Sequence, residues 1–328
     1  MNEVRIACPS RLHIGLIDLN GEIGRIDGGT GIALENPRTV IYAKKSDHLE
    51  VECPQDPDAI SRAEEAARAV IRRYDLPPAK IVVEERPFVH VGLGSATQLL
   101  VGVARALCLL AEQSVSSAEL ASVVNRGGTS GIGVASFEHG GFIVDGGHNF
   151  RTGDTANSKS EYSPSSAVRG LMPPPVLARY DFPDWDILVC VPTGEETAGI
   201  REVEIFKIVC PVPMEEVRKI CHLVLLKMLP AIIERDLESF GFAVEESQKY
   251  GFKTFEFRAQ SRGVLQCMDF LKKNGGIGVG MSSWGPTLFA FGKDLTDLCE
   301  KTGRFLADNM GGTCFVTRAN NTGMKVLG

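Results

Sequence analysis

The sequence predicts an α+β fold, built from strands and helices that follow one another without strict alternation. Residues 63–74 carry apolar side chains at helical spacing, whereas residues 80–85 alternate in the way a half-buried strand does. With 328 residues and 44% apolar side chains, the chain can form one large domain or two modest ones. The irregular succession favours an α+β arrangement over a doubly wound parallel sheet.

The first half is expected to be rich in strands, with helices behind them. A capping-box pattern, Ser-Ser-Ala-Glu at 116–119, predicts a short helix that ends near Asn125. Further helices are expected at residues 63–74 and 96–112, and strands at 4–8, 31–44, 49–53, 80–85 and 142–145.

The second half is expected to form a separate domain. The polar stretch 152–166 and the Met-Pro-Pro-Pro run at 172–175 are typical of a linker, which predicts domains at 1–175 and 176–328. Pro230 should interrupt or kink the chain between two helices. Strands are expected at 186–191, 287–291 and 314–318, and helices at 215–229, 232–248, 260–273 and 296–308.

Charge and composition exclude several classes of partner. The net charge is −6 without any basic run, which argues against nucleic-acid binding. The longest apolar run, 99–111, is interrupted by Arg105 and is too short to span a bilayer. The nine cysteines form no Cys-x-x-Cys pair, and the first residues do not match a secretory signal. We therefore expect a cytoplasmic protein with reduced thiols and no membrane partner.

The most informative stretch is a glycine-rich turn that leads directly into an apolar helix, Val-Gly-Leu-Gly-Ser-Ala-Thr-Gln at 91–98. Glycines allow the backbone to approach a ligand closely. The free N–H groups at the start of a helix favour the binding of phosphate. The spacing fits neither the P-loop nor the Rossmann fingerprint. An ordinary helix capped by Ser95 or Thr97 is the alternative. The residues expected to bind substrate here are Gly92, Leu93, Gly94, Ser95, Ala96, Thr97 and Gln98.

A basic pair, Arg11 and His13, follows the first expected strand. Side chains two residues apart share one face of an extended segment, so both could face the same anionic ligand. An exposed pair at the end of a strand is the alternative.

A second polar motif is Gly-Arg-Ile-Asp-Gly-Gly-Thr-Gly at 24–31. The planar guanidinium of Arg25 suits phosphate or carboxylate, and Asp27 could hold a divalent ion together with phosphate oxygens. Gly28 and Gly29 are counted among the substrate-binding residues. The alternative is a hairpin-like turn with solvated charges.

A third motif is Gly-Met-Ser-Ser-Trp-Gly-Pro-Thr at 280–287. The small hydroxyl residues Ser282 and Ser283 suit a second ligand-contact loop before a strand. Trp284 offers a flat surface for stacking. A plain turn is the alternative.

In order and rough spacing, these motifs resemble those of the GHMP kinase superfamily. Residues 9–16 resemble its N-terminal motif, Gly-Leu-Gly-Ser at 92–95 its central phosphate loop, and residues 280–285 its C-terminal Met-Ser-Gly-x-Gly motif. The resemblance covers the whole chain. It implies a two-domain GHMP-kinase-like fold, with an N-terminal domain of the ribosomal-S5-like type and a C-terminal α+β domain.

One departure from the superfamily pattern bears directly on activity. GHMP kinases usually carry Pro-Ser-Gly-x-Asp, whose aspartate serves the phosphoryl acceptor, whereas this chain has Gly-Thr-Ser-Gly-Ile-Gly at 128–133. Gly133 stands at the position of that aspartate. Because glycine has no carboxylate, it cannot be that base.

The departures resemble one non-kinase branch, the β-ribofuranosylaminobenzene 5′-phosphate synthases of methanopterin biosynthesis. Similar motifs are Ser-Arg-Leu-His-x-Gly at 10–15, His-x-Gly-Leu-Gly-Ser-x-Thr-Gln at 90–98 and Arg-Gly-Gly-Thr-Ser-Gly-Ile-Gly at 126–133. The resemblance implies that phosphoribosyl pyrophosphate condenses with 4-hydroxybenzoate or 4-aminobenzoate, releasing pyrophosphate and CO2. It also implies a requirement for Mg²⁺ and a homodimer.

This chemistry suggests roles for individual side chains. Arg11, His13 and Arg25 are the candidates for stabilising the departing pyrophosphate. His90 could act on the phenol or aniline group, or simply pack before the turn. Arg126 and Ser130 are candidates for binding substrate, although Arg126 could instead only interact with a helix dipole. Asp18 and Asp27 are candidate magnesium ligands. The candidate walls for the aromatic ring are Trp284, Phe137 and Phe142.

Two other functions stay open from the sequence. An ATP-dependent small-molecule kinase of the same superfamily would need a replacement carboxylate, for which Glu138 or Asp145 is available. A non-catalytic relative would bind a phosphorylated ligand without turnover. ATP consumption with a panel of alcohols separates the kinase from the synthase.

Overall fold

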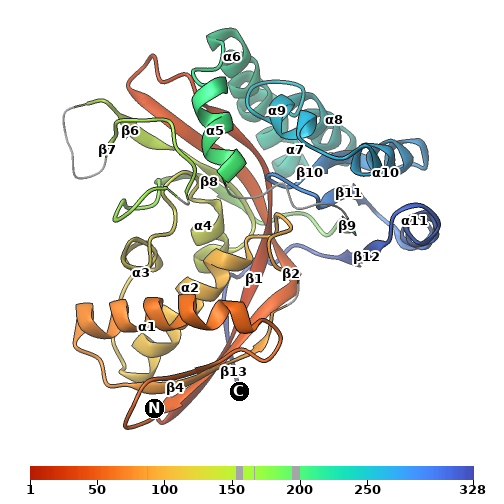
Figure 1. The fold of residues 1–328 in the computed structure, drawn as a ribbon. Coiled ribbons are helices and arrows are strands. Elements are labelled where there is room, and N and C mark those ends of the chain that lie inside the picture. Colours follow the sequence, from red (N-terminus) through yellow and green to blue (C-terminus); the bar gives the residue numbers. More distant parts are fainter. Residues whose placement is uncertain (87, 153–157, 166, 194–199) are drawn as a thin grey trace.

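Two long strands, β1 (Glu3–Asp18) and β2 (Arg25–Lys45), run antiparallel through the length of the molecule (Figure 1). The computed structural model describes residues 1–86, 88–152, 158–165, 167–193 and 200–328. The first strand was expected to end at residue 8, and that boundary is wrong. Leu12 and Ile14 extend the buried face of β1, and a β-bulge after Pro9 accommodates the proline. The motifs at 9–16 and 25–31 therefore lie within paired strands.

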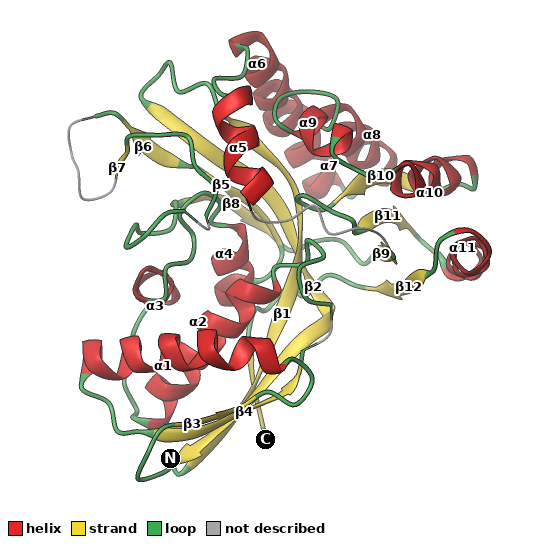
Figure 2. Cartoon of the chain, viewed as in Figure 1, coloured by secondary structure: helices red, strands yellow, loops and turns green. Residues whose placement is uncertain are grey.

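Within the described residues, the first sheet has nine strands. Five follow the order β13-β1-β2-β4-β3, β5 and β6 also pair with β2, β7 pairs with β6, and β8 pairs with β5. Four helices gather on one side of it (Figure 2), where their apolar faces form a core with the strands. The capping box expected at Ser116 and Glu119 is present at the start of α3. The elements are β3 (Glu50–Glu52), β4 (Ala79–Glu85), β5 (Phe142–Asp145), β6 (His148–Phe150), β7 (Ser158–Lys159), the 3-10 turn η1 (Pro57–Ala59), α1 (Ile60–Tyr74), α2 (Ser95–Leu110), α3 (Ser117–Val123) and α4 (Ile132–His139).

In the part of the chain that the structure describes, the second sheet has four strands in the order β10-β11-β9-β12. Alternate residues of its central strands pack into two different cores, one with α8 and one with α10 and α11, which explains why these strands are apolar throughout. Its elements are β9 (Asp186–Pro192), β10 (Ile277–Met281), β11 (Leu288–Gly292), β12 (Gly312–Thr317), α5 (Ile200–Val209), α6 (Met214–Leu223), the π-helical turn η2 (Val224–Met228), α7 (Leu229–Glu234), α8 (Leu237–Ser247), α9 (Lys253–Arg258), α10 (Arg262–Lys273) and α11 (Thr296–Asn309).

An interruption or a kink was expected at Pro230, and the interruption is wrong. Helix α6 continues through η2 into α7, and Pro230 lies in the first turn of α7. Within η2, the Leu229 N–H donates to the carbonyl of Val224, five residues back, so the wider turn accommodates the proline. The break comes at Arg235, whose φ is +57°, and Asp236 then caps α8.

The second half of the chain returns twice to the first sheet. Strand β8 (Val176–Tyr180) pairs with β5, and β13 (Lys325–Leu327) pairs with β1. A domain boundary at residue 175 stays a prediction, and parts of the expected linker (residues 153–157 and 166) lie outside the described residues. All nine cysteines are free thiols, as expected. Among the described helices, none is long and apolar enough to cross a membrane.

Candidate active site

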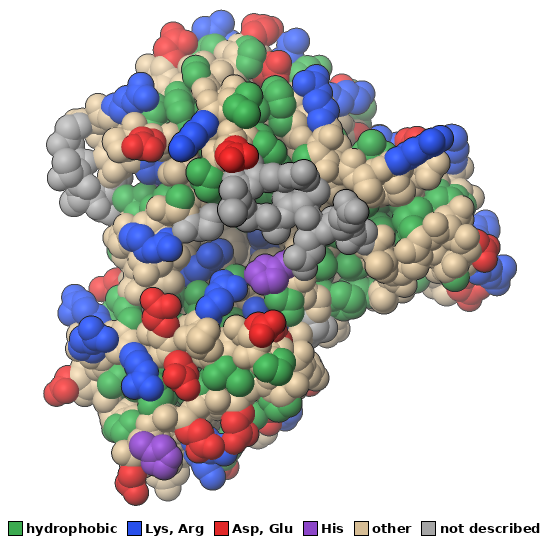
Figure 3. All heavy atoms as spheres, in the orientation of Figure 1, with side chains coloured by type: hydrophobic (Ala, Val, Ile, Leu, Met, Phe, Trp, Pro, Cys, Tyr) green, Lys and Arg blue, Asp and Glu red, His purple; other side chains and the backbone are tan. Residues whose placement is uncertain are grey.

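A cavity of about 840 Å³ lies where the first sheet and its helices meet the loops of the second. Figure 3 shows Lys, Arg and His side chains gathered around a hollow between the α1–α2 region and the α5 region. Residues from many separate segments of both halves of the chain form its wall. The predicted site residues among them are Arg11, His13, His90, Gly92, Gly94, Ser95, Ala96, Arg126, Ser130, Ser283 and Trp284.

The start of helix α2 forms one end of this cavity. Gly94 is the N-cap residue with a φ of +80°, a conformation that favours glycine. No side chain caps this helix, so the alternative of capping by Ser95 or Thr97 is wrong. The first N–H groups of a helix have no partner within it. Ser95 and Ala96 lie in the cavity wall, which leaves this helix start available to an anion.

Arg11 and Arg126 bring two guanidinium groups to the same end. Arg11 Nη1 donates to the Gly92 carbonyl at 2.5 Å, and Arg126 Nε donates to the Thr97 hydroxyl at 3.1 Å. Burial and the charge of Arg126 lower the pKa of Arg11 to about 10, although Glu256 opposes the shift. A bound anion would relieve this mutual repulsion, so the arrangement is suited to phosphate or pyrophosphate.

Gly92 connects the phosphate loop to the C-terminal motif. Its carbonyl accepts a second hydrogen bond from the hydroxyl of Ser282, at 2.7 Å. A Cβ at Gly92, where φ is +89°, would lie only 2.3 Å from the Ser282 carbonyl oxygen. Ser282 is fully buried and also accepts the His13 backbone N–H at 2.9 Å. The serine therefore holds β1 and the phosphate loop together.

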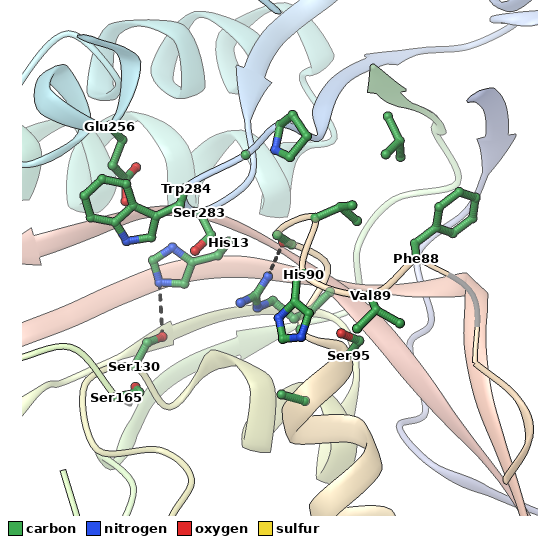
Figure 4. Close-up of a pocket in the computed structure, with 18 of the residues that line it drawn as sticks. His13, Phe88, Val89, His90, Ser95, Ser130, Ser165, Glu256, Ser283 and Trp284 are labelled. Atoms are coloured by element: carbon green, nitrogen blue, oxygen red, sulfur yellow. Dashed lines mark hydrogen bonds between the residues drawn. The ribbon is translucent and has the colours of Figure 1, made fainter. Parts of the chain in front are cut away.

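His13 begins a short chain of polar side chains that leads away from the cavity. Its Nε2 lies 3.1 Å from the Ser130 hydroxyl (Figure 4). The Ser130 hydroxyl in turn lies 3.4 Å from Asp145 Oδ2. Burial and the charges of Arg11 and Lys253 lower the pKa of His13 well below its usual value. Burial raises the pKa of Asp145 to about 7. The imidazole is therefore neutral, and the carboxyl titrates near neutrality.

The wall beyond His13 is apolar and aromatic. Trp284 meets Phe252 edge to face, with ring centroids 5.3 Å apart, and Phe252 packs against Phe206 at 4.4 Å. All three rings line the cavity and offer a surface for a flat ligand. The expectation that Phe137 and Phe142 form such walls is wrong, because both are buried in hydrophobic cores.

Arg25, Asp27 and Asp18 lie elsewhere. Arg25 donates to the carbonyls of Gly146 and Gly147 and to the side chain of Asn149, and so braces a turn. The buried Asp27 carboxylate accepts hydrogen bonds from Lys159 Nζ at 3.1 and 3.2 Å and lies 2.7 Å from His148 Nδ1. Asp18 accepts the N–H groups of Asn20 and Gly21 in the turn after β1. These contacts occupy the groups that were predicted to bind substrate or magnesium.

Gly28 and Gly29 support the site from behind. Gly28 has a φ of +68°, which favours glycine. A Cβ at Gly29 would lie 3.2 Å from His13 Nε2, 3.3 Å from Asp145 Oδ2 and 3.4 Å from the Ser130 hydroxyl. Gly29 thus allows the three polar side chains to approach one another.

His90, Leu93 and Gln98 occupy three different positions around the phosphate loop. His90 is exposed at the cavity rim with a φ of +61°, and Figure 4 shows it beside Ser95. Leu93 is buried, and its carbonyl accepts the Arg11 backbone N–H at 3.1 Å. Gln98 is also buried and donates from Nε2 to the carbonyl of Gly133 at 3.1 Å.

Comparisons with known proteins show the family to which the chain belongs. Residues 61–141 match the GHMP kinases N terminal domain, and residues 228–300 match the GHMP kinases C terminal family. The β-ribofuranosylphenol 5′-phosphate synthase of Archaeoglobus fulgidus is 42% identical over 326 residues, covering 98% of this chain and 99% of that protein. The synthase of the same name from Methanocaldococcus jannaschii is 40% identical over 340 residues, with coverage of 98% and 99%.

The chain belongs to the β-ribofuranosylphenol 5′-phosphate synthase family. Its fold within that family is of the GHMP kinase type, as predicted. The homoserine kinase of Cytophaga hutchinsonii superposes with a TM-score of 0.70 at 16% identity, covering 100% of this chain and 98% of that one. The Methanococcus jannaschii mevalonate kinase gives 0.70 at 12% identity, covering 97% and 99%. At these identities the likeness concerns the fold alone.

A buried ion pair in the site of this synthase family member was not predicted from the sequence. Lys253 Nζ lies 2.5 Å from Glu256 Oε2 and donates to the carbonyls of Met281 and Ser283. Glu256 is 5% exposed and forms part of the cavity wall. Burial lowers the pKa of Lys253 and raises that of Glu256. The pair positions the loop that carries Ser283 and Trp284.

Proposed function

We propose that this chain condenses phosphoribosyl pyrophosphate with 4-hydroxybenzoate to give a C-riboside 5′-phosphate, releasing pyrophosphate and CO2. The name shared by its relatives specifies a ribofuranosylphenol 5′-phosphate as the product, which favours the hydroxy over the amino acceptor. The observation that carries the proposal is the helix start of α2, where two guanidiniums converge while position 133 holds no carboxylate.

The anion end of the cavity would hold the pyrophosphate of the donor. Departure of pyrophosphate makes C1 of the ribose electron-poor, and fixed donors stabilise the charge that develops on the leaving group. Arg11, Arg126 and the N–H groups of Ser95 and Ala96 are the donors we propose. Removing one such preorganised donor commonly raises a reaction barrier by about 2.7–4 kcal/mol.

Magnesium would enter this site with the substrate. Among the described residues, no three His, Cys, Asp or Glu side chains form a group that could hold a metal ion. Mg²⁺ is usually bound by one or two carboxylates together with substrate phosphates, which fits a pyrophosphate-borne ion. Bound in this way, it would neutralise part of the leaving-group charge. Asp18 and Asp27 stay predictions as its protein ligands, and their present hydrogen bonds would have to be exchanged.

The aromatic end of the cavity would hold the acceptor. Trp284 and Phe252 would pack against the benzoate ring and exclude water from the electron-poor ribose carbon. The ring carbon that bears the carboxylate attacks C1 of the ribose, and loss of CO2 then restores aromaticity. We propose that the para substituent of this ring faces His13, which also lines the cavity.

The kinase alternative has less support. The two replacement carboxylates considered from the sequence are both engaged away from the cavity. Glu138 accepts hydrogen bonds from Arg105 and from the Ser117 N–H, and Asp145 is fully buried behind Ser130. Neither is among the side chains that line the cavity within the described part of the chain.

We further propose a cytoplasmic homodimer. The free thiols of the chain suit a reducing compartment. Helical segments of the second half expose large apolar side chains that a second copy could cover, namely Leu225, Leu226, Ile233 and Phe242. Light scattering of the wild-type chain and of Leu226→Glu tests the dimer, which the charge should weaken.

A direct assay tests the proposed reaction. The chain is incubated with Mg²⁺, phosphoribosyl pyrophosphate and 4-hydroxybenzoate labelled in its carboxyl group. Labelled CO2 and pyrophosphate should form in equal amounts, and omission of phosphoribosyl pyrophosphate should abolish both. Absence of labelled CO2 in the complete mixture would contradict the proposal.

A further inference from the structure

The second ring nitrogen of His13 is buried and lacks a partner. The His13 side chain is part of the cavity wall, and its Nδ1 forms no hydrogen bond with any described residue. Figure 4 shows the ring between Ser130 on one side and the Ser283–Trp284 segment on the other. Leaving a buried polar atom unpaired is unfavourable, so a ligand atom is expected to pair with it.

The other nitrogen faces a hydroxyl that can pass a proton in either direction. Ser130 Oγ accepts the backbone N–H of Ile132 at 3.2 Å, which fixes its position. Its single proton can then point to His13 Nε2, at 3.1 Å, or to Asp145 Oδ2, at 3.4 Å. The direction it takes sets the tautomer of the imidazole, and hence whether Nδ1 accepts or donates.

Asp145 is held rigidly at the far end of this chain. Its Oδ2 accepts the Gly131 N–H and its Oδ1 accepts the Gly147 N–H, both at 3.0 Å. Burial and the nearby charge of Asp27 favour the protonated form, whereas the backbone donors favour the carboxylate. The opposing influences leave a carboxyl that can both take up and release a proton near neutral pH.

We infer that His13, Ser130 and Asp145 form a proton relay that removes the phenolic proton of the acceptor at His13 Nδ1. This inference rests on the proposed function. The phenol O–H bond breaks and an Nδ1–H bond forms, while the proton on Nε2 moves to Ser130 Oγ and the proton of Ser130 moves to Asp145 Oδ2. Asp145 ends protonated, and His13 ends neutral in its other tautomer.

The relay supplies what the ring carbon needs for attack. The electron pair left on the phenolate oxygen is delocalised to the para carbon, which bears the carboxylate and attacks C1 of the ribose as the bond to pyrophosphate breaks. Loss of CO2 returns the pair to the phenolate oxygen, and the proton then returns along the same chain. No net proton is consumed by the relay. Burial and the positive charges of Arg11 and Lys253 keep the imidazole of His13 neutral, and the two charges also favour the phenolate.

Turnover of two acceptor substrates, 4-hydroxybenzoate and 4-aminobenzoate, distinguishes a proton relay from a purely structural role of these residues. An aniline donates its nitrogen lone pair to the ring without losing a proton, so 4-aminobenzoate does not need the relay. For Asp145→Asn and for Ser130→Ala, kcat with 4-hydroxybenzoate should fall at least about 100-fold, the lower range of general-base effects. With 4-aminobenzoate the loss should stay within about threefold. Ser122→Ala, which removes a hydroxyl bonded to Gly170 on the surface, should change neither rate.

Several results would overturn the proton relay. Equal losses with both acceptors, or no loss with either, would overturn the relay. If wild type turns over only the hydroxy acceptor, the pH profile decides: Ser130→Ala should abolish the fall in kcat below neutrality, and an unchanged profile would overturn the relay. Melting temperatures identify a variant that has not folded, in which case the other variant is used. Failure of wild type with both acceptors would instead contradict the proposed function.

Discussion

Gly133 packs directly against Thr97, so that a Cβ at Gly133 would lie 3.3 Å from three atoms of the threonine side chain. By the motif resemblance in the sequence, Gly133 corresponds to the aspartate of the GHMP kinase pattern. Thr97 belongs to the first turn of α2 and accepts a hydrogen bond from Arg126. The space a carboxylate would need is therefore occupied by the residue that orients one of the two guanidiniums of the anion site.

Introducing an aspartate at position 133 should not create kinase activity. Gly133→Asp would push Thr97 and bring a negative charge beside Arg126, so turnover of the ribosyl transfer should fall at least tenfold. ATP consumption should stay at background. Steady-state assays of both reactions check this, with Gly133→Ala as the control for the steric contribution alone. ATP-dependent phosphorylation of an alcohol by Gly133→Asp would contradict our interpretation of this site.

The contact of Gly92 with Ser282 predicts a severe effect from a single methyl group. Gly92→Ala combines a positive φ with a Cβ only 2.3 Å from a carbonyl oxygen, so the loop must move and binding of phosphoribosyl pyrophosphate should be lost. Calorimetric titration measures the affinity. Gly303→Ala is the matched control: no atom lies within 4 Å of its Cβ in α11, and it should stabilise the helix by up to about 1 kcal/mol.

Arg11 should affect catalysis far more than an exposed arginine does. Arg11→Ala removes a fixed donor at the anion end, and a loss of about 2.7–4 kcal/mol of transition-state stabilisation corresponds to roughly 100- to 1,000-fold in kcat. Arg304→Ala, whose side chain is largely exposed on α11, should leave kcat unchanged. Equal rates for the two variants would remove Arg11 from the site.

Lys159 should prove to be a structural residue. Its ammonium and the Asp27 carboxylate are both buried, and breaking such a pair typically costs about 3–5 kcal/mol because one charge stays uncompensated. Denaturant unfolding of Lys159→Met should show this loss, whereas Lys301→Met, which removes an exposed partner of Asp297, should change stability by less than about 1 kcal/mol. Wild-type stability in Lys159→Met would show that Asp27 is free for another partner, such as magnesium.

The pKa of Asp145 predicts the pH dependence of the reaction. Burial raises this pKa to about 7, so the carboxylate that receives the relayed proton is depleted as the pH falls below that value. The kcat for 4-hydroxybenzoate should therefore fall at acidic pH and level off above neutrality. In Asp145→Asn the remaining activity should lose this dependence. An identical profile in wild type and variant would assign the titration to another group.

The parts of the site that could be predicted from sequence are those in which one local segment carries the chemistry. The glycines at 92 and 94 indicated a helix start open to phosphate, and the two-residue spacing of Arg11 and His13 indicated a shared face; both pairs do line the cavity. The present contacts of Arg25 and Asp27, with a turn and with Lys159, could not be predicted, because a charged residue in a glycine-rich stretch has the same local pattern whether it binds a ligand or stabilises a turn.

Other contributors come together only through tertiary structure. Lys253 and Glu256 lie on a two-turn helix with no recognisable motif, and their burial depends on the loop that follows β10. Asp145 was considered from the sequence only as a replacement carboxylate for a kinase, and its link to His13 depends on Ser130 and on Gly29 of a different strand. No spacing along the chain carries that information.

A competition experiment tests the central claim most directly. Wild-type chain is mixed with Mg²⁺, 4-hydroxybenzoate and equal concentrations of phosphoribosyl pyrophosphate and ATP, and the products are identified by mass spectrometry. We predict a ribosylphenol 5′-phosphate that has lost the carboxyl carbon, together with pyrophosphate and unconsumed ATP. Formation of ADP and a phosphorylated acceptor, with phosphoribosyl pyrophosphate left intact, would contradict the account.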